Sequence, residues 1–396
     1  EIVGGTFEYN DPNGAAIVML GDSSFKMTGG TLEVTKGSAV NPGYLGTQVI
    51  DISGGTIVCS HGGNWAFSTS DSLGAFDATL KISENATIKV GNSDKFVTGF
   101  FTKVAVSGGN FDVKIDDKYL AEGFELKDNG DGTFGVQTAA KGSAKNPYTL
   151  AELGAMTRDE YIAAQEALGG TMYVTVGNYE YKDADAKGRI NGVLGNGKRD
   201  DTLHQTEDRS VLNGYNSNGY LGEGNDGANG KTIVFVNGSI TSGATGYSSI
   251  DNIGTSLLLA VPAYTHVKFE GITFNNVISF DYQLYTGPWS QLGSLEFDEC
   301  VFNGIIVGAI ATQTLAFRKC TFNNYTNTTS ANNSNPTWIR PAYGNWSKGD
   351  NEGQGGDFKS LTTIIFEDNT VTSTRPVKFE RIAQWEMDTT VTVTGN

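Results

Sequence analysis

The chain has 396 residues, of which 44 are acidic and 28 are basic, so its formal net charge at pH 7 is -16. This balance argues against a nucleic-acid partner, because phosphate binding depends on Lys and Arg, and it disfavours adsorption to anionic lipid. The length accommodates either several compact domains or a long solenoid that buries a continuous core by stacking. No long apolar run is present, so we expect no membrane insertion in this chain.

A repeat of 25 residues marks the first part of the chain. The tripeptide Gly-Gly-Thr begins at Gly4, Gly29 and Gly54, and alternating apolar residues follow it each time. A glycine pair before a strand supplies the positive φ that the corner of a coil needs. Variants of the repeat at 81–90 and 106–113 continue the series, and the Asn-Gly-Asp-Gly sequence at 129–132 predicts the turn of a closing hairpin. We therefore expect residues 1–140 to form an N-terminal β-solenoid.

A domain junction is expected at 137–147, where the repeat stops. Two capping boxes follow, with Thr149 and Glu152 in the first and Thr157 and Glu160 in the second. The second box opens the one α-helix that the sequence predicts, near 157–168, and the glycine pair at 169–170 ends it. We expect this helix to cap a second solenoid in the unit 141–396, because an uncovered terminal coil exposes an unpaired strand edge.

A short phrase is repeated in that second unit, from His266, Ser294 and Thr314, with looser copies from Thr232 and Thr363. Aligning the copies gives two columns of mostly aromatic residues: Phe235, Phe269, Phe297, Phe317 and Phe366 in the first, and Ile240, Phe274, Phe302, Phe322 and Val371 in the second. Apolar and charged residues alternate within each copy with the period of a strand. We therefore predict an all-β protein, a right-handed parallel β-helix in two solenoid segments with one capping helix.

Cysteines do not form a disulfide framework in this sequence. Cys300 and Cys320 occupy the same position in successive copies, and Cys59 lies in the first unit. Parallel register brings the Cα atoms of such a pair about 4.8 Å apart, but stacked side chains rarely reach the dihedral angle of a disulfide. We expect Cys300 and Cys320 to be stacked interior thiols.

Catalysis was weighed because parallel β-helices are common among polysaccharide lyases and glycosidases. Four carboxylates fall on neighbouring coils, at Asp298, Glu299, Glu367 and Asp368, and Arg318 or Arg381 would be the base of a lyase. Alternating charge is, however, expected on the solvent face of any β-helix, and a pair of carboxylates can be found in any acidic chain. We predict no catalytic residue, with a carbohydrate-active enzyme as the alternative.

Metal and cofactor motifs are not found either. The three histidines, His61, His204 and His266, lack metal-ligand spacing. The acidic hairpin turn lacks the alternate ligands and the distal Glu of a calcium loop. No phosphate-binding or dinucleotide-binding sequence lies between a strand and a helix. We predict no metal and no cofactor.

Aromatic and basic residues concentrate in two insertions of the second unit and in its last segment. Aromatic insertions beside a rigid scaffold are typical of recognition surfaces, for sugars or for proteins. The alternative is that these side chains fold back onto their own loops and that the basic ones neutralise nearby carboxylates. We predict a binding face made of Tyr282, Tyr285, Trp289, Trp338, Tyr343, Trp346, Arg375, Arg381 and Trp385. The polar insertion at 182–230 is assigned no function.

Several stretches resemble a family of surface proteins. The segment VSGGNFDVKIDDKYLAEGFELKDNGDGTFGV at 106–136 resembles a unit of surface proteins from gut Firmicutes. The segments NPYTLAELGAMTRDEYIAAQEALGG, NDGANGKTIVFVNGSITSG and TSTRPVKFERIAQWEM resemble the repetitive cell-wall proteins of Lachnospiraceae and their neighbours. Some proteins that resemble these are immunoglobulin-binding B-cell superantigens. No catalytic or binding motif transfers with the resemblance, residue by residue.

The resemblance implies export and cell-wall attachment through regions outside this chain, which is expected to be a monomeric module of a larger protein. It also implies a role that faces the host or a glycan. From it we expect a non-enzymatic, adhesin-like binding module, whose ligand is a host protein such as an immunoglobulin variable region. A glycan-binding module and a structural stalk are the other non-enzymatic alternatives.

Overall fold

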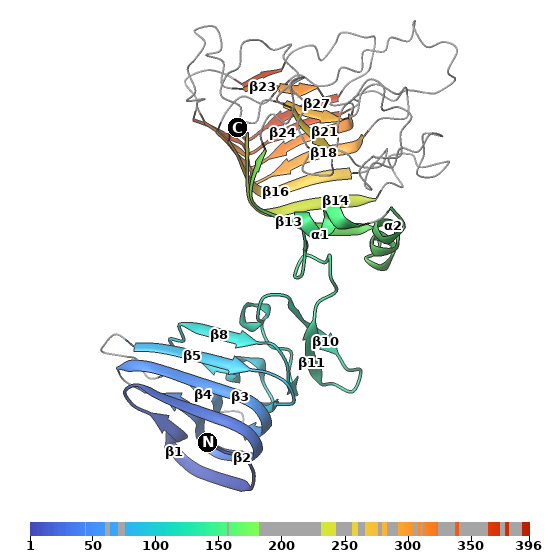
Figure 1. The fold of residues 1–396 in the computed structure, drawn as a ribbon. Coiled ribbons are helices and arrows are strands. Elements are labelled where there is room, and N and C mark those ends of the chain that lie inside the picture. Colours follow the sequence, from blue (N-terminus) through green and yellow to red (C-terminus); the bar gives the residue numbers. More distant parts are fainter. Residues whose placement is uncertain are drawn as a thin grey trace, which may run out of the picture. The chain divides into compact units, whose positions relative to one another are not determined.

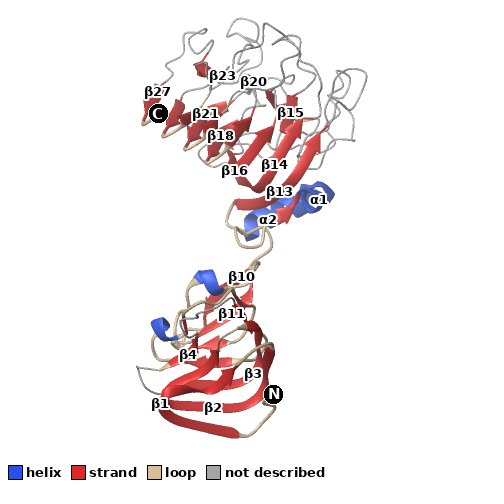
Figure 2. Cartoon of the chain, turned by 90° about the vertical axis from the view of Figure 1, so that its left-hand side faces the viewer, coloured by secondary structure: helices blue, strands red, loops and turns tan. Residues whose placement is uncertain are grey.

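The computed structural model describes residues 1–43, 45–59, 64–69, 76–156, 158–181, 231–242, 256–259, 266–275, 279–282, 292–303, 307–309, 312–323, 337–339, 363–372, 377–379 and 390–396. The fold is all-β, with short helices (Figures 1 and 2). The chain divides into two compact units, unit 1 (Glu1–Ala140) and unit 2 (Lys141–Asn396).

Unit 1 contains one sheet of 11 strands, in which neighbours run parallel except around the last hairpin. Along the chain its strands are β1 (Thr6–Met19), β2 (Ser23–Pro42), β3 (Gly46–Cys59), β4 (Trp65–Ser68), β5 (Phe76–Ile82), β6 (Thr87–Lys89), β7 (Val97–Thr98), β8 (Lys103–Val106), β9 (Asn110–Phe111), β10 (Phe124–Asp128) and β11 (Phe134–Thr138). Two 3-10 helices, η1 (Ser93–Lys95) and η2 (Asp117–Tyr119), lie between them. The predicted hairpin is confirmed, because β10 and β11 pair antiparallel.

Glycine pairs lie where successive repeats of unit 1 approach each other. The second glycine of the pair has a positive φ, 82° at Gly5 and 79° at Gly55. A Cβ built on Gly54 would lie 2.4 Å from the carbonyl oxygen of Thr28, whereas one on Gly4 meets nothing within 4 Å. The repeated pair therefore serves the backbone conformation and also lets one repeat stack closely on the previous one.

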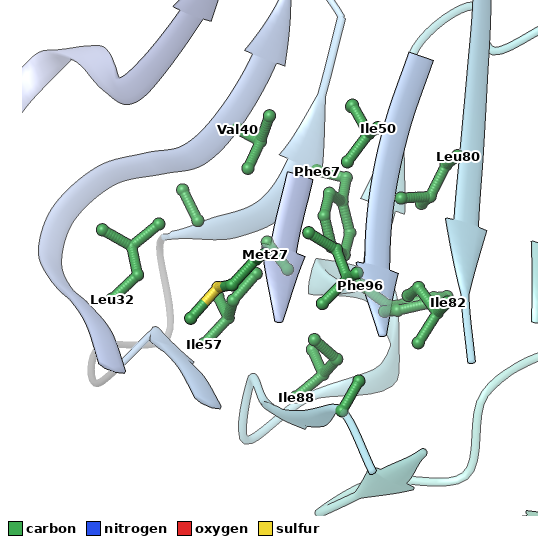
Figure 3. Packing of buried hydrophobic residues seen from close by; sticks show 14 of the residues in the cluster. Met27, Leu32, Val40, Ile50, Ile57, Phe67, Leu80, Ile82, Ile88 and Phe96 are labelled. Atoms are coloured by element: carbon green, nitrogen blue, oxygen red, sulfur yellow. The ribbon is translucent and has the colours of Figure 1, made fainter. Parts of the chain in front are cut away.

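Aliphatic side chains fill most of the interior of unit 1. Ile50, Leu80 and Ile82 are fully buried and lie together in Figure 3. The aromatic rings among them meet edge to face: Phe96 lies 5.9 Å from Phe67 between ring centroids, at an interplanar angle of 87°. This core is packed without continuous ring stacking.

Unit 2 contains a second sheet of 11 strands and a third sheet of five, in both of which all pairs are parallel. The larger sheet contains β12 (Tyr148–Thr149), β13 (Thr171–Tyr181), β14 (Thr232–Ser242), β16 (His266–Asn275), β18 (Leu292–Asp298), β19 (Val301–Asn303), β21 (Thr312–Arg318), β22 (Thr321–Phe322), β24 (Thr363–Glu367), β25 (Thr370–Val371) and β27 (Thr390–Thr394). The smaller sheet, here called the five-stranded sheet, contains β15 (Ser256–Leu259), β17 (Ser279–Tyr282), β20 (Val307–Ala309), β23 (Thr337–Ile339) and β26 (Val377–Phe379). Along the chain, strands of the two sheets alternate, so each repeat contributes to both.

The two predicted columns are confirmed by strand register and burial. Phe269 pairs with Phe297, which pairs with Phe317, and their rings stack with centroids 5.4 and 4.9 Å apart. In the second column Phe274 pairs with Phe302, and these rings stack at 5.0 Å. All five side chains are buried. β21 pairs directly with β24, so the interval of 49 residues between Phe317 and Phe366 is one repeat with a long insertion.

The prediction of a single helix is wrong, because two helices precede the second unit's main strands. They are α1 (Leu150–Ala155) and α2 (Arg158–Ala167). α1 is opened by the capping box of Thr149 and Glu152, which is enough to start a helix of six residues that has no apolar periodicity to announce it. Within the described residues, no helix is long and apolar enough to span a membrane.

Both helices cover the end of the unit 2 core that lies beside β13. Leu153 of α1 and Tyr161 of α2 are buried in the same apolar cluster as Met172 of β13. Gln165 donates a hydrogen bond of 3.1 Å from Nε2 to the carbonyl oxygen of Thr232, which ties α2 to β14. The predicted capping is therefore done by two helices rather than one.

Candidate functional site

The five-stranded sheet contains two of the predicted binding residues. Tyr282 ends β17, where it pairs with Leu259, and Trp338 lies in β23, where it pairs with Val307 and Lys378. The sequence assigned both to surface insertions, and that assignment is wrong for their backbone. Strands of three or four residues are too short to show an alternating pattern of their own, so each looked like part of a loop.

The other predicted binding residues lie outside the described residues. These are Tyr285, Trp289, Tyr343, Trp346, Arg375, Arg381 and Trp385. The polar insertion at 182–230 also lies outside them, as do His61 and His204. The parallel strands β17, β20, β23 and β26 nevertheless bring together three segments that precede or follow these residues in sequence.

Ion pairs connect neighbouring strands on the outer face of the larger unit 2 sheet. Lys268 of β16 lies 2.6 Å from Glu270 on its own strand and 3.3 Å from Asp298 on β18, between its Nζ atom and a carboxylate oxygen. Desolvation lowers the pKa of Lys268, but hydrogen bonds and the charges of Glu270 and Asp298 outweigh it, so the pKa lies above its ordinary value. Lys268 is therefore held as a cation between two carboxylates.

Arg318, one of the two bases considered for a lyase, is also engaged in this network. Its Nη1 atom lies 2.7 Å from Glu296 and its Nε atom 3.7 Å from Glu367, across three adjacent strands. Lys319 pairs with Glu299 at 3.2 Å, and both side chains are largely exposed. These carboxylates and cations alternate along a strand face instead of converging on one point. Such an arrangement can hold neighbouring repeats in register, but its groups already bind one another.

A row of side-chain hydrogen bonds crosses the repeats of unit 2, and the sequence analysis missed it. Asn303 donates from Nδ2 to Oδ1 of Asn275 at 3.0 Å, and Asn323 donates in the same way to Asn303 at 2.7 Å. Asn275 donates to Thr241, and Thr372 donates to Asn323, so the row is continuous over five strands. The alignment of the phrase already puts these three asparagines at one position, which is the signal that could have found them.

Both cysteines of unit 2 are buried free thiols, as expected from their position. Cys300 donates from Sγ to the carbonyl oxygen of Phe269 at 3.3 Å, and Cys320 donates to that of Phe297 at 3.5 Å. Burial raises the pKa of Cys300 far above its ordinary value, and burial also raises the pKa of Cys59 in unit 1, to about 12. The thiols therefore stay protonated and serve packing rather than nucleophilic chemistry.

Metal-binding chemistry finds no support in the described ranges. His266 lies at the start of β16, where its Nδ1 atom is 2.9 Å from the hydroxyl of Ser294. No group of three or more His, Cys, Asp or Glu side chains among the described residues is placed to hold a metal ion. The acidic turn of the unit 1 hairpin is closed by its own hydrogen bonds, with Asp128 accepting from Gly130 and Asp131 from Thr133.

A cavity of about 580 Å³ lies in unit 1 beside η1 and η2. Carboxylates and ammonium groups of both signs line it, among them Asp94, Lys114 and Asp116. The Asp116 carboxylate pairs with Lys118 at 2.9 Å and also accepts a hydrogen bond from the Lys118 backbone, which lowers its pKa. The lining therefore neutralises part of its own charge and shows no convergent set of catalytic groups.

Comparison of the chain with protein-family models, with curated proteins and with solved structures gives no match.

Proposed function

We propose that the chain is a non-enzymatic binding module of an extracellular surface protein, built on a right-handed parallel β-helix. The repeat-by-repeat alternation between two parallel sheets in unit 2 supports the β-helix. A connection between parallel strands of one sheet is right-handed in about 98 % of cases, which supports the handedness. Export and attachment to a cell wall follow from the resemblance to repetitive surface proteins of gut Firmicutes.

The observation that carries this proposal is the joining of aromatic-bearing segments into the five-stranded sheet. β17, which ends at Tyr282, and β23, which contains Trp338, both pair with β20. A row of parallel strands fixes the spacing of whatever the adjoining segments present. Aromatic residues on a rigid support lose little conformational freedom on binding, which is why they are enriched at the centres of interfaces.

The ligand that we propose is a host protein, with an immunoglobulin variable region as the first candidate. Strand edges and aromatic surfaces are features that the sheets of an antibody framework can dock against, and tandem copies of such a module would add avidity. The outer face of the larger sheet is a less suitable surface, because its Lys268 and Arg318 side chains are already bound to carboxylates. We therefore assign binding to the five-stranded sheet and the segments next to it.

Biolayer interferometry tests this assignment with the full chain immobilised and Fab and Fc fragments of host immunoglobulin in solution. We expect Fab to bind and Fc not to bind. Substituting Trp338→Ala or Tyr282→Ala should weaken Fab binding by about tenfold or more, the effect typical of an aromatic at the centre of an interface. Lys319→Ala is the matched control on the larger sheet, and circular dichroism checks that each variant is folded.

Three results would contradict the proposal in different ways. Unchanged Fab affinity in both aromatic variants would remove the assigned face. Binding to glycans but not to Fab would replace the host protein by a sugar ligand. Release of reducing ends or unsaturated products from polysaccharides would show an enzyme, which the proposal denies.

A further inference from the structure

Three large apolar side chains are exposed at one corner of unit 1. Leu20 is 65 %, Leu45 60 % and Phe100 63 % exposed. They come shortly before β2, β3 and β8, and β5 lies between β3 and β8, so the four strands are neighbours in the order β2, β3, β5, β8 (Figure 1). Exposed apolar residues that occur singly need no explanation, but a contiguous group marks an interaction surface.

Register shows that these residues form one group. Ser23 pairs with Gln48, so Leu20 and Leu45, each three residues earlier, occupy the same position of successive repeats. Leu20 also reaches the next repeat, because its Cδ2 atom would lie 3.0 Å from a Cβ on Gly43. Two strands farther, the residue after Phe101 pairs through its N–H with the repeat that follows Gln48. We call the row of Leu20, Leu45 and Phe100 the apolar ridge.

The backbone of Leu45 gives a second, independent observation. Its φ is 63°, a left-handed conformation that a bulky side chain adopts only at a cost. Burial does not offset this cost, since the side chain is mostly in solvent. Glycine would relieve the strain and lose no core packing. A strained residue that folding does not need is a sign of function.

Charge indicates the kind of partner. The row next to the ridge contains Asp22 and Asp77, both exposed, which flank Thr47 on β3. Asp22 is fixed in place, because its Oδ1 atom accepts a hydrogen bond of 2.8 Å from the Thr47 N–H. The nearest cation along this edge is Lys103 at the start of β8, and the whole chain has a net charge of -16. The ridge is thus an apolar stripe beside a carboxylate row on an acidic protein.

We propose that the apolar ridge is a second docking surface, for a partner protein segment that presents apolar side chains flanked by Lys or Arg. Its apolar side chains would cover Leu20, Leu45 and Phe100, and its cations would face Asp22 and Asp77. This surface belongs to unit 1 and is independent of the binding face proposed in unit 2. Its failure would leave that proposal untouched.

The probe is a synthetic amphipathic helical peptide of Leu and Lys, titrated against the full chain and followed by fluorescence anisotropy. Leu45→Gly should weaken peptide binding by about tenfold, the loss of a well-buried anchor, while the melting temperature stays equal or rises. Glu84→Gly is the matched control: Glu84 is an exposed residue with φ of 51°, so it relieves the same strain and should leave binding unchanged. Phe100→Ser should weaken binding, and Asp77→Asn should weaken it less.

Two further peptides separate the contributions. A Ser/Lys peptide of equal charge and a Leu/Glu peptide of equal apolar content should both bind much more weakly than the Leu/Lys peptide. Equal binding of the Ser/Lys peptide, or undiminished binding to the Leu45→Gly chain, would overturn the proposal. Self-association of the wild-type chain in analytical ultracentrifugation that Leu45→Gly abolishes would overturn it too, because the occupant would then be a second copy.

Discussion

Units 1 and 2 stack parallel strands in register, but they solve the corner between strands and the filling of the core differently. Unit 1 uses glycine pairs at its repeat boundary and aliphatic side chains inside. Unit 2 turns with non-glycine residues in the left-handed region, such as Glu299 at 53° and Lys319 at 51°, and fills its core with stacked phenylalanines.

The difference follows from how closely the repeats approach. At the unit 1 corner the backbones are so near that a Cβ would meet a carbonyl oxygen, so glycine is required there for space as well as for φ. In unit 2 the corner side chains point outward, and their polar ends pair across repeats, as Lys319 does with Glu299. A close corner constrains the sequence strictly, whereas an open corner tolerates any residue whose side chain can reach a partner.

The largest expected effect is on the phenylalanine column. Phe297→Ala removes a fully buried ring stacked between Phe269 and Phe317, and should lower the free energy of unfolding of unit 2 by about 3–5 kcal/mol. Phe297→Leu, which keeps most of the volume, should cost under about 1.5 kcal/mol. Denaturant unfolding followed separately in the two units measures both changes. A loss confined to unit 1 would show that the column is not the core of unit 2.

The glycine corner gives the next effect, in the other unit. Gly54→Ala brings a methyl group onto the Thr28 carbonyl oxygen and should destabilise unit 1 by about 1–3 kcal/mol, the cost of overpacking. Gly4→Ala changes the same position of the first repeat, where nothing lies within 4 Å, and should cost under about 0.5 kcal/mol. Equal effects of the two substitutions would mean that backbone conformation, and not close stacking, selects the glycine.

The asparagine row of unit 2 should contribute less than its core. Asn303→Ala breaks the bonds to Asn275 and Asn323, and because the row is only half-buried, water replaces part of what is lost. We expect unit 2 to lose about 1–2 kcal/mol in chemical denaturation. Thr372→Val, at the end of the row, breaks one bond and is the smaller-effect control. If both variants unfold like the wild type, the row adds no stability.

The smallest effect is expected at the open corner. Lys319 and Glu299 are 62 % and 65 % exposed, so their ion pair is screened by solvent. Lys319→Ala keeps a side chain in the left-handed region and removes only the charge, and it should change stability by less than about 0.5 kcal/mol. Thermal unfolding at low and high salt measures it. A loss above 1.5 kcal/mol would show that unit 2, like unit 1, depends on its corner.

Sequence periodicity predicted the strands that are long and regular. The phrase at Phe269, Phe297 and Phe317 and the Gly-Gly-Thr repeat gave the correct columns and register, because stacking in a parallel sheet demands the same residue type at the same place. The short helix α1 and the strands β17 and β23 were missed. Segments of two to six residues contain less than one full period of any pattern, so their structure comes from neighbouring repeats.

Candidate site residues were harder to predict than the fold. The choice of Tyr282 and Trp338 rested on residue type alone, and only the pairing of β17 and β23 through β20 relates them in space. The apolar ridge was missed, although Leu20 and Leu45 stand at one position of the 25-residue repeat. Exposure and a positive φ are properties of the folded backbone, and no pattern of residue types announces them.

The central claim is that unit 2 is a stack of repeats in fixed register, on which its binding segments are displayed. Spin labels on Cys at Thr232 and Thr363 test it directly, since these positions are joined through His266, Ser294 and Thr314 across four strand steps. Pulsed electron paramagnetic resonance should give one narrow distance distribution near 19 Å, four spacings of about 4.8 Å. A broad distribution, or one centred well beyond 30 Å, would contradict the stack.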